Sequence, residues 1–289
     1  NAGKYISLSL NSLSNEEQKN LAVIHPLTES ELLSMPLAER FICSRCHEVC
    51  NNVTKYLETY LFSEALKLIS DFIWDEFADW YVEVSKTRSN NPTQHLIAQK
   101  VLVYIWDTSL RVLHPFMPFI TETLWQLIPH EGATIMLKNW PKNEDGSDLF
   151  VDHSSIQYFT FFQTIVKVIR NTRSEYSVEG KKKIPITIVF RGQSSELYQE
   201  LMNQEKNPLC TLAKIDPEHF SSTLDSEEYN NANKYLRVLV NESCDIIILK
   251  DSLIDTQKEK IRISSQIEKL KLSIKPLQIR LQSDGFISK

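Results

Sequence analysis

Between residues 37 and 130, apolar side chains recur at steps of three and four, and this period limits the possible fold more than any other feature of the sequence. The first set lies between residues 37 and 60, and its members are Phe41, Cys46, Val49, Val53, Tyr56 and Tyr60. This spacing places them on one face of a helix. A second stripe follows Ser63, and its members are Leu66, Ile69, Ile73, Phe77, Trp80, Tyr81 and Val84.

Two further helices are expected in the same region. Thr93 suits the start of the third, which runs to about His114, because the residue before Pro115 is driven out of the helical backbone region. Pro118 suits the first position of a fourth helix that extends to about Ile128. Four amphipathic helices with short connections predict a helical bundle.

The residues after the bundle alternate between helical and strand-like patterns. A helix is expected over residues 155–176. The runs Ile184–Phe190 and Cys244–Leu249 are short and rich in β-branched residues, which is typical of strands. Weaker strand signals occur at Leu209–Ile215 and Tyr235–Val240. Together these patterns predict a small α+β unit.

The last 40 residues change character again. Their apolar positions step by 4, 3, 4, 3 and 4, and they are Ile263, Ile267, Leu270, Ile274, Leu277 and Leu281. That is the a/d seam of a coiled coil, which Pro276 is expected to bend and Asp284-Gly285 to end. Such a helix needs a partner, and we expect an antiparallel one beyond Lys289. The predicted fold is mainly α, in three parts: a helical bundle (1–145), an α+β linking domain (146–250) and the first helix of a truncated coiled-coil arm (251–289).

Charge is distributed unevenly along the chain, which restricts where a polyanion could bind. The 289 residues carry a net charge of −5, with −7 in residues 1–150 and +2 in residues 151–289. Residues 163–191 contain seven basic and two acidic side chains. An acidic protein that binds RNA must do so through such confined patches. The alternative is a solvated helix face with cations near its C-terminus.

Five cysteines raise the question of a metal or haem site. Cys43, Cys46 and His47 match the C-x-x-C-H pattern of haem attachment, and Cys50 adds a third thiol. The three cysteines fall on or near the apolar face of the first helix, where free cysteine packs as a small hydrophobe. Two isolated cysteines elsewhere do not complete a four-ligand zinc site. We therefore expect buried thiols, no disulfide and no metal; a metal or haem protein is the alternative.

No catalytic constellation is visible. The P-loop, G-x-G-x-x-G and G-x-S-x-G motifs are absent, and Asp75, Glu76 and Asp79 are expected on an outer helix face. No apolar run approaches the roughly 18 residues of a membrane span, and no secretory signal opens the sequence. Because the sequence starts at Asn1 without an initiator Met, we expect a part of a longer cytoplasmic protein. A transit peptide upstream would make it organellar.

Several motifs resemble class I aminoacyl-tRNA synthetases of the valyl, isoleucyl and leucyl subgroup. Residues 39–45 (ERFICSR) resemble the family's D-R-W-I-L-S-R, and residues 114–122 (HPFMPFITE) are similar to its H-P-F-M-P-F-I-T-E. Residues 169–176 (IRNTRSEY) and Lys183-Ile184-Pro185 resemble the valyl members. The resemblance spans nearly the whole chain and is weakest between residues 193 and 235.

The resemblance implies a role in tRNA binding. In the family, the bundle reads the anticodon and the coiled-coil arm braces the outer corner of the tRNA. The full-length enzyme uses ATP and Mg²⁺ to join valine to its tRNA, and hydrolyses mischarged threonine at a separate site. The nucleotide-binding signatures H-I-G-H and K-M-S-K-S are absent here. We therefore expect no catalytic residue and no cofactor in this chain, which would act as a monomer with valine-accepting tRNA and with the catalytic and editing domains N-terminal to it.

Basic side chains are the candidates for contact with phosphates and unstacked bases. They are Lys4, Arg40, Arg45 and Arg111 in the bundle and Arg170, Arg173, Lys181, Lys182 and Lys183 in the linking domain. Arg45 lies between two cysteines expected in the core, so pairing with a helix neighbour is its alternative role. For the whole chain, the alternatives are a coiled-coil module that binds protein and the corresponding region of an isoleucyl or leucyl enzyme.

Overall fold

The computed structural model describes residues 2–10, 15–22, 27–192, 195–224, 227–253 and 256–281. Packing groups the chain into two compact units, Asn1–Val166 with Leu197–Ala213, and Lys167–Glu196 with Lys214–Lys289. Helix α9 (His153–Glu175) contributes to both units. The predicted division into three parts at residues 145 and 250 stays a prediction.

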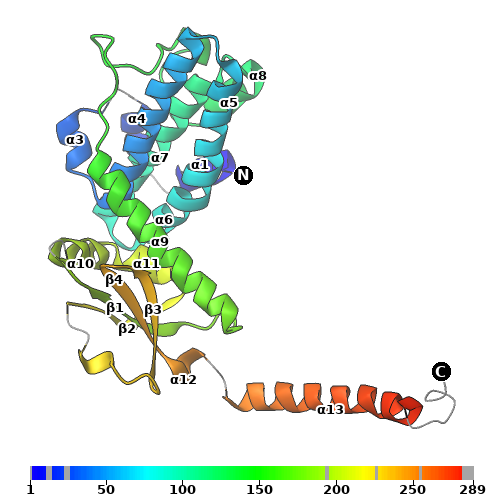
Figure 1. Ribbon diagram of the computed structural model, residues 1–289. Helices are drawn as coiled ribbons and strands as arrows, with labels where there is room; N and C mark the ends of the chain where they lie inside the picture. Colours follow the sequence, from blue (N-terminus) through cyan, green and yellow to red (C-terminus); the bar gives the residue numbers. More distant parts are fainter. Residues whose placement is uncertain are drawn as a thin grey trace. The chain divides into compact units, whose positions relative to one another are not determined.

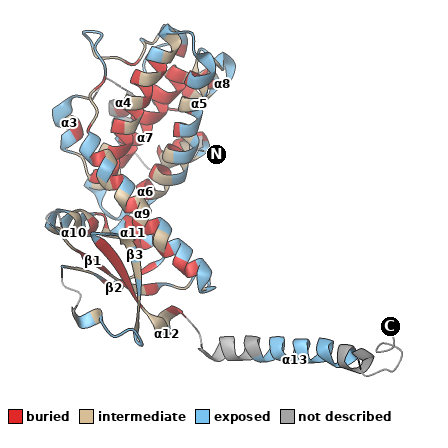
Figure 2. Cartoon of the chain, in the orientation of Figure 1, coloured by how far each residue is buried: buried red, intermediate tan, exposed pale blue. Residues whose placement is uncertain are grey.

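The first unit is a helical bundle, as predicted. Two long helices, α4 (Leu37–Glu58) and α7 (Pro92–Leu113), form its centre, and Figure 2 shows that most of their residues are buried. The surrounding elements are α1 (Ala2–Leu10), α2 (Asn15–Ala22), α3 (Glu29–Leu33), α5 (Phe62–Asp71), a π-helix η1 (Phe72–Tyr81), α6 (Val82–Lys86), η2 (Thr87–Asn90), α8 (Pro118–Trp125), η3 (Ile135–Leu137), α10 (Ser195–Gln204) and α11 (Lys206–Ala213).

The C-terminal ends of α4 and α7 lie at the same end of the bundle (Figure 1). The segment after α8 joins them. Trp140 Nε1 donates to Thr54 Oγ1 near the end of α4 at 2.8 Å. Its neighbour Asn139 accepts from Arg111, near the end of α7, at 3.1 Å. The α4–α5 and α7–α8 turns are therefore presented on one surface of the bundle.

The second predicted helix is continuous but changes its winding. After α5, ten residues form the π-helix η1, and α6 completes the stretch. Phe72, Phe77 and Tyr81 are buried, at steps of five and four residues. The wider π turn explains why Ile73 and Trp80, expected in the core from a period of 3.6, are only half-buried.

The three clustered cysteines lie in the bundle core, which confirms their predicted burial. Cys43, Cys46 and Cys50 are each at most 1% exposed. Burial raises the pKa of the Cys43 thiol well above its usual value, so the thiol stays protonated. In the part of the chain that the structure describes, no three His, Cys, Asp or Glu side chains are placed to share a metal ion.

The second unit contains a four-stranded mixed sheet in the order β2-β1-β4-β3. Its strands are β1 (Ile184–Phe190), β2 (Ile215–Thr223), β3 (Tyr235–Asn241) and β4 (Cys244–Leu249). β1 pairs parallel with β2 and antiparallel with β4. The expectation of a strand at Leu209–Ile215 was wrong. Leu209, Cys210, Leu212 and Ala213 are buried at helical spacing in α11, and the strand starts only at Ile215.

The chain continues through α12 (Lys250–Leu253) into α13 (Thr256–Leu281), the single helix expected from the heptad pattern. Pro276 lies inside it. Ile267, Leu270 and Ile274 of the seam are 45–61% exposed. Pairing of this seam with a second helix stays a prediction, and the expected stop at Asp284-Gly285 lies outside the described residues. No helix in the described ranges is long and apolar enough to cross a membrane.

Candidate nucleic-acid interface

Large apolar side chains are exposed at the two turns that lie together at one end of the bundle. We call this surface the bundle end and define it by Tyr60, Leu61 and Phe62 on the α4–α5 turn and Met117, Phe119 and Ile120 on the α7–α8 turn. Tyr60 is 79% and Phe119 is 89% exposed, while the other four are 41–55% exposed. Flat rings offered to solvent can stack with unpaired nucleobases.

Tyr60 is held in place by the end of α4. The Tyr60 N–H donates to Leu57 O at 3.1 Å and the Leu61 N–H donates to Tyr56 O at 2.8 Å. This is the Schellman motif, whose left-handed position is usually glycine. Tyr60 adopts it with a φ of 63°. A tyrosine here is conformationally unfavourable, yet its ring is exposed, so neither backbone preference nor core packing accounts for the residue.

The α7–α8 turn is fixed by its own polar contacts. His114 Nδ1 lies 2.7 Å from Thr121 Oγ1, which joins the two sides of the turn. Pro118 occupies the first turn of α8, as predicted, and Phe119 follows it. The expectation that Pro115 drives the preceding residue out of the helical backbone region was wrong, since His114 keeps helical angles (φ −56°, ψ −41°) and the helix ends one residue before it.

Exposed apolar side chains continue from α8 onto η3. Met136 is 74% and Leu137 is 78% exposed. Glu122 holds this segment against α8 by accepting from Thr134 Oγ1 at 2.7 Å and from the Ile135 N–H at 3.1 Å. Hydrogen bonds from Gln126 and Thr134 lower the pKa of Glu122, so the carboxylate stays ionised.

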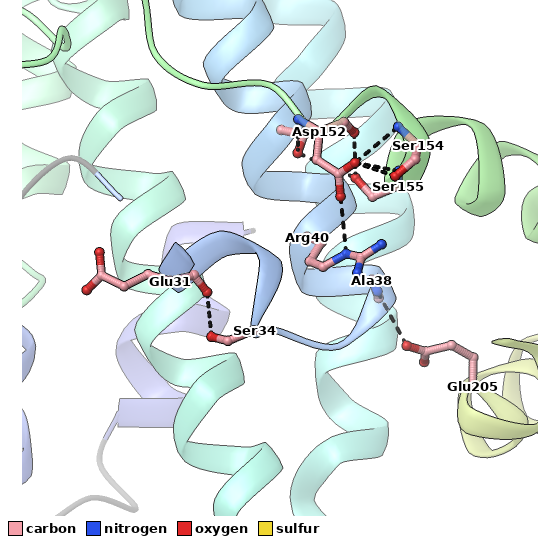
Figure 3. Close-up of polar contacts among 9 residues, drawn as sticks. Glu31, Ser34, Ala38, Arg40, Asp152, Ser154, Ser155 and Glu205 are labelled. Atoms are coloured by element: carbon pink, nitrogen blue, oxygen red, sulfur yellow. Dashed lines mark hydrogen bonds and ion pairs between the residues drawn. The ribbon is translucent and has the colours of Figure 1, made fainter. Parts of the chain in front are cut away.

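Arg40 faces a carboxylate at the start of α9 (Figure 3). Its Nε lies 3.2 Å from Asp152 Oδ2. Asp152 also accepts from the backbone N–H groups of Ser154 and Ser155 at 3.1 and 3.2 Å, which caps α9. The cost of burying Asp152 is outweighed by these hydrogen bonds and by Arg40, so its pKa is lowered.

Arg45 and Arg111 are also paired with carboxylates. Arg45 donates to both oxygens of Glu76 at 2.7 Å and contacts Glu48 one helical turn along, which confirms the expected pairing with a helix neighbour. Arg111 lies 2.6 Å from Asp107. Among the bundle candidates, Lys4 is exposed on α1. The contact of all four with RNA stays a prediction.

The candidates of the second unit differ in exposure. Arg170, Lys181 and Lys183 are exposed and Lys182 is half-buried. Arg173 is 7% exposed and donates to Glu179 O at 3.0 Å and Lys214 O at 3.3 Å. The first four are thus placed where a polyanion could reach them, whereas Arg173 ties the end of α9 to neighbouring backbone.

The aromatic side chains of the bundle end were not among the residues expected from the sequence to contact RNA. Tyr60 was assigned to the buried stripe of α4 and is instead exposed. The run Tyr60-Leu61-Phe62 held a usable signal, because three consecutive large apolar residues cannot all point to one helix face. For Phe119, the proline before it marks a helix start and so a surface turn.

Two buried polar groups of α4 were also missed. His47 Nδ1–H donates to Phe150 O at 2.6 Å, and Nε2 accepts from the Tyr104 hydroxyl at 2.7 Å. Because a carbonyl only accepts, Nδ1 carries the proton. Burial lowers the pKa of His47 to about 4, so the ring is neutral at pH 7 and Nε2 acts as the acceptor. Glu39 is fully buried beside Arg88, and burial raises its pKa to about 7. Both groups stabilise the scaffold and lie away from solvent.

Known proteins resemble this chain over its whole length. A sequence profile described as the anticodon-binding domain of tRNA ligase matches residues 39–188. The chain is 34% identical, over all of its length, to the chloroplastic/mitochondrial valine–tRNA ligase 2 of Arabidopsis thaliana. It is 34% identical over 88% of its length to the valine–tRNA ligase of Carboxydothermus hydrogenoformans, and 32% over 96% to that of Thermotoga maritima.

The chain spans 28–30% of the length of these three relatives. The matched profile covers more than half of the chain, including most of α4, the bundle end and most of the strand β1. The chain therefore belongs to the family of the anticodon-binding domains of tRNA ligases.

Proposed function

We propose that this protein is the anticodon-binding part of a valine–tRNA ligase and that unstacked bases of the anticodon loop stack on the bundle end. The ligase would join valine to its tRNA with ATP and Mg²⁺ in the cytoplasm, as a monomer whose chemistry resides in the rest of the chain. Valine-accepting tRNA is the proposed partner.

The exposed ring of Tyr60 is the observation that carries this proposal. Its unfavourable backbone conformation and its 79% exposure are unexplained by the fold. A base stacked on the ring would give a reason for both. Phe119, 89% exposed on the neighbouring turn, offers a second aromatic ring at the same end.

The surroundings indicate stacking rather than phosphate binding as the role of this surface. Arg111 is paired with Asp107, and Lys55 lies 3.4 Å from Asp148, so nearby cations are largely neutralised. Base–aromatic stacking works without a strong local charge. The exposed lysines Lys181 and Lys183 of the second unit are the better placed groups for phosphate contacts.

The test is binding of a valine tRNA transcript, beside the same transcript with a swapped anticodon, at two salt concentrations. Tyr60→Ala and Phe119→Ala should each weaken binding of the valine transcript by about 5- to 150-fold, from the usual value of one stacked base. Their preference for the valine anticodon should shrink. Leu33→Ala is the matched control, because Leu33 is 44% exposed but lies on α3, before the N-terminal end of α4.

Either of two results would contradict the proposal. If both aromatic variants bind the two transcripts as the unsubstituted chain does, the bundle end makes no base contact. If the chain binds both transcripts equally, anticodon discrimination belongs elsewhere in the ligase.

A further inference from the structure

A pocket of about 720 Å³ opens on the first unit, formed by α1, η1, α6, α7 and α8. Its volume lies within the range of ordinary ligand pockets. Apolar side chains make up most of its wall, and those used below are Leu8, Trp74, Trp106 and Leu127. The two turns of the bundle end do not contribute to it.

The pocket wall contains a buried donor without an acceptor. Trp106 is 6% exposed, and its ring stacks on Phe77 with centroids 6.0 Å apart. Its indole N–H has no hydrogen-bond partner in the described part of the chain. Buried donors are normally paired, because an unpaired one loses its hydrogen bond to water. An acceptor from outside these residues would complete the site.

The rim of the pocket is apolar and exposed. Trp74 on η1 is 73% exposed, Leu8 on α1 is 59% exposed, and Leu127 in the turn after α8 is 56% exposed. Contiguous apolar surface of this kind marks interaction sites. Large side chains around a pocket, with polar groups outside them, resemble the centre of a protein–protein interface.

The charges around the pocket favour a protein over RNA. Lys4 and Lys86 line it, but so do Asp79 and Glu83, which leaves no net charge. Lys86 is paired with Glu83 and lies over the Tyr5 ring at 5.3 Å. A phosphate backbone would meet two carboxylates here, and one of the two lysines is already paired with Glu83. A protein segment with an apolar anchor meets no such conflict.

We propose that this pocket and rim dock another segment of the same ligase chain, from outside these 289 residues. An apolar side chain of that segment fills the pocket, and an oxygen acceptor, such as a backbone carbonyl, accepts from Trp106 Nε1. About 70% of the length of the valine–tRNA ligase relatives lies outside the matched region, so the occupant is available in cis. This inference rests on the proposed function only in taking the chain as part of such a ligase.

Cysteine footprinting tests the proposal. All five native cysteines are buried, so a cysteine placed on the rim reacts selectively with a thiol reagent. Leu127→Cys and Leu8→Cys are made in the 289-residue chain and in the full-length ligase, and their alkylation is followed by peptide mass spectrometry without tRNA. Alkylation should be at least about 10-fold slower in the full-length ligase, as expected for a site removed from solvent. Leu33→Cys is the control and should react equally in both proteins.

Three outcomes would overturn the proposal. Equal alkylation in both proteins would mean that nothing covers the rim. Protection that needs added tRNA would make the pocket an RNA site. Protection in the 289-residue chain that grows with its concentration would identify a second copy as the occupant.

Trp106→Phe supplies a second measurement. It keeps an aromatic ring and removes the N–H. Alkylation of Leu127→Cys should then become about 5-fold faster in the full-length ligase, as expected for the loss of one hydrogen bond. In the 289-residue chain, the substitution loses buried ring volume but no internal hydrogen bond, so any fall in the unfolding midpoint measures lost packing alone. No change in the alkylation rate of the full-length ligase would remove Trp106 from the interface.

The proposed function has its own readout in the same experiment. Phe62→Cys at the bundle end should be protected by tRNA alone. If tRNA does not protect Phe62→Cys while Leu127→Cys is protected in the full-length ligase, anticodon binding at the bundle end is rejected and the docking site is kept. If tRNA protects Phe62→Cys while Leu127→Cys is not protected, the docking site is rejected and anticodon binding is kept.

Discussion

Arg88 Nη2 lies 2.8 Å from the Glu205 carboxylate, 117 residues further along the chain, and both side chains are buried. The same guanidinium lies 2.9 Å from Glu39. Glu205 also accepts from the Ala38 N–H at 3.3 Å, at the first turn of α4 (Figure 3). One arginine thus joins η2, α4 and the start of α11 inside the first unit.

Removing this arginine should destabilise the first unit strongly. Arg88→Met leaves two carboxylates buried without their cation, which costs about 3–5 kcal/mol in comparable cases. Urea unfolding, followed by far-UV circular dichroism, measures the loss. Lys67→Met removes an exposed ion pair with Asp71 and should leave the midpoint unchanged. Equal midpoints for the two variants would show that the buried cluster does not stabilise the fold.

Glu39 should make stability depend on pH. Burial raises its pKa from 4.5 to about 7, against the attraction of Arg88. A folded pKa above the unfolded one means that the folded state binds the proton more tightly. The stabilising contribution is therefore complete below pH 4.5 and is lost as the pH rises to about 7.

Glu39→Gln removes this titration. Relative to the unsubstituted chain, its free energy of unfolding should rise by about 1–3 kcal/mol between pH 4.5 and pH 7. Urea unfolding at four pH values in this window measures the difference. A difference that is constant with pH would place the Glu39 titration outside the window.

His47 should make stability depend on pH in the opposite direction to Glu39. Burial lowers its pKa from 6.5 to about 4, so the folded state favours the neutral ring. The contribution to stability is present above pH 6.5 and is lost as the pH falls through 4. His47→Gln should lose stability at pH 7 by about 1–3 kcal/mol, because at least one of the two hydrogen bonds fails.

Measurements at several pH values separate the hydrogen bonds lost in His47→Gln from the titration of His47. Between pH 6.5 and pH 4, the unsubstituted chain should lose up to about 3 kcal/mol more than His47→Gln does. Unfolding of both proteins at pH 7, 5.5 and 4 gives the comparison. Parallel losses in the two proteins would assign acid sensitivity to other groups.

Elements with a strong local pattern could be predicted from the sequence. α4 and α7 follow from a 3.6-residue period, and β1 and β4 from short β-branched runs. The π-helix could not be predicted, because the step that places Phe77 in the core five residues after Phe72 is decided by packing. The prediction of a strand at Leu209–Ile215 was wrong for a related reason, because a short apolar run fits a buried helix equally well.

The site could be predicted only by residue type. Net charge and spacing identified the arginines, but Arg40 and Arg45 meet Asp152 and Glu76 through tertiary contacts that no local pattern encodes. The exposure of Tyr60 depends on where α4 ends, and helix ends are the least certain part of a sequence-based prediction. The charge pattern of the sequence therefore indicated a polyanion partner, whereas the exposed aromatic surface could be identified only from the structure.

Arg173 and the neighbouring lysines of the second unit allow a last prediction, because they carry the same charge at different burial. Arg173→Gln should lower the free energy of unfolding by about 1–3 kcal/mol, since Glu179 O and Lys214 O lose their buried donor. The salt dependence of tRNA binding should stay the same, because a guanidinium that is 7% exposed releases no counterion from RNA.

The triple variant with Lys181→Gln, Lys182→Gln and Lys183→Gln should keep the stability of the chain but change the salt dependence of tRNA binding. Stability should change little, because Lys181 and Lys183 are exposed. The slope of log K against log salt concentration should become shallower by about 1 for each lost phosphate contact, and by at most about 3. Filter binding of a valine tRNA transcript at four salt concentrations measures the slope, and urea unfolding measures the stability. An unchanged slope in the triple variant would move the phosphate contacts away from these lysines. A shallower slope in Arg173→Gln would show that the buried guanidinium becomes accessible when RNA binds.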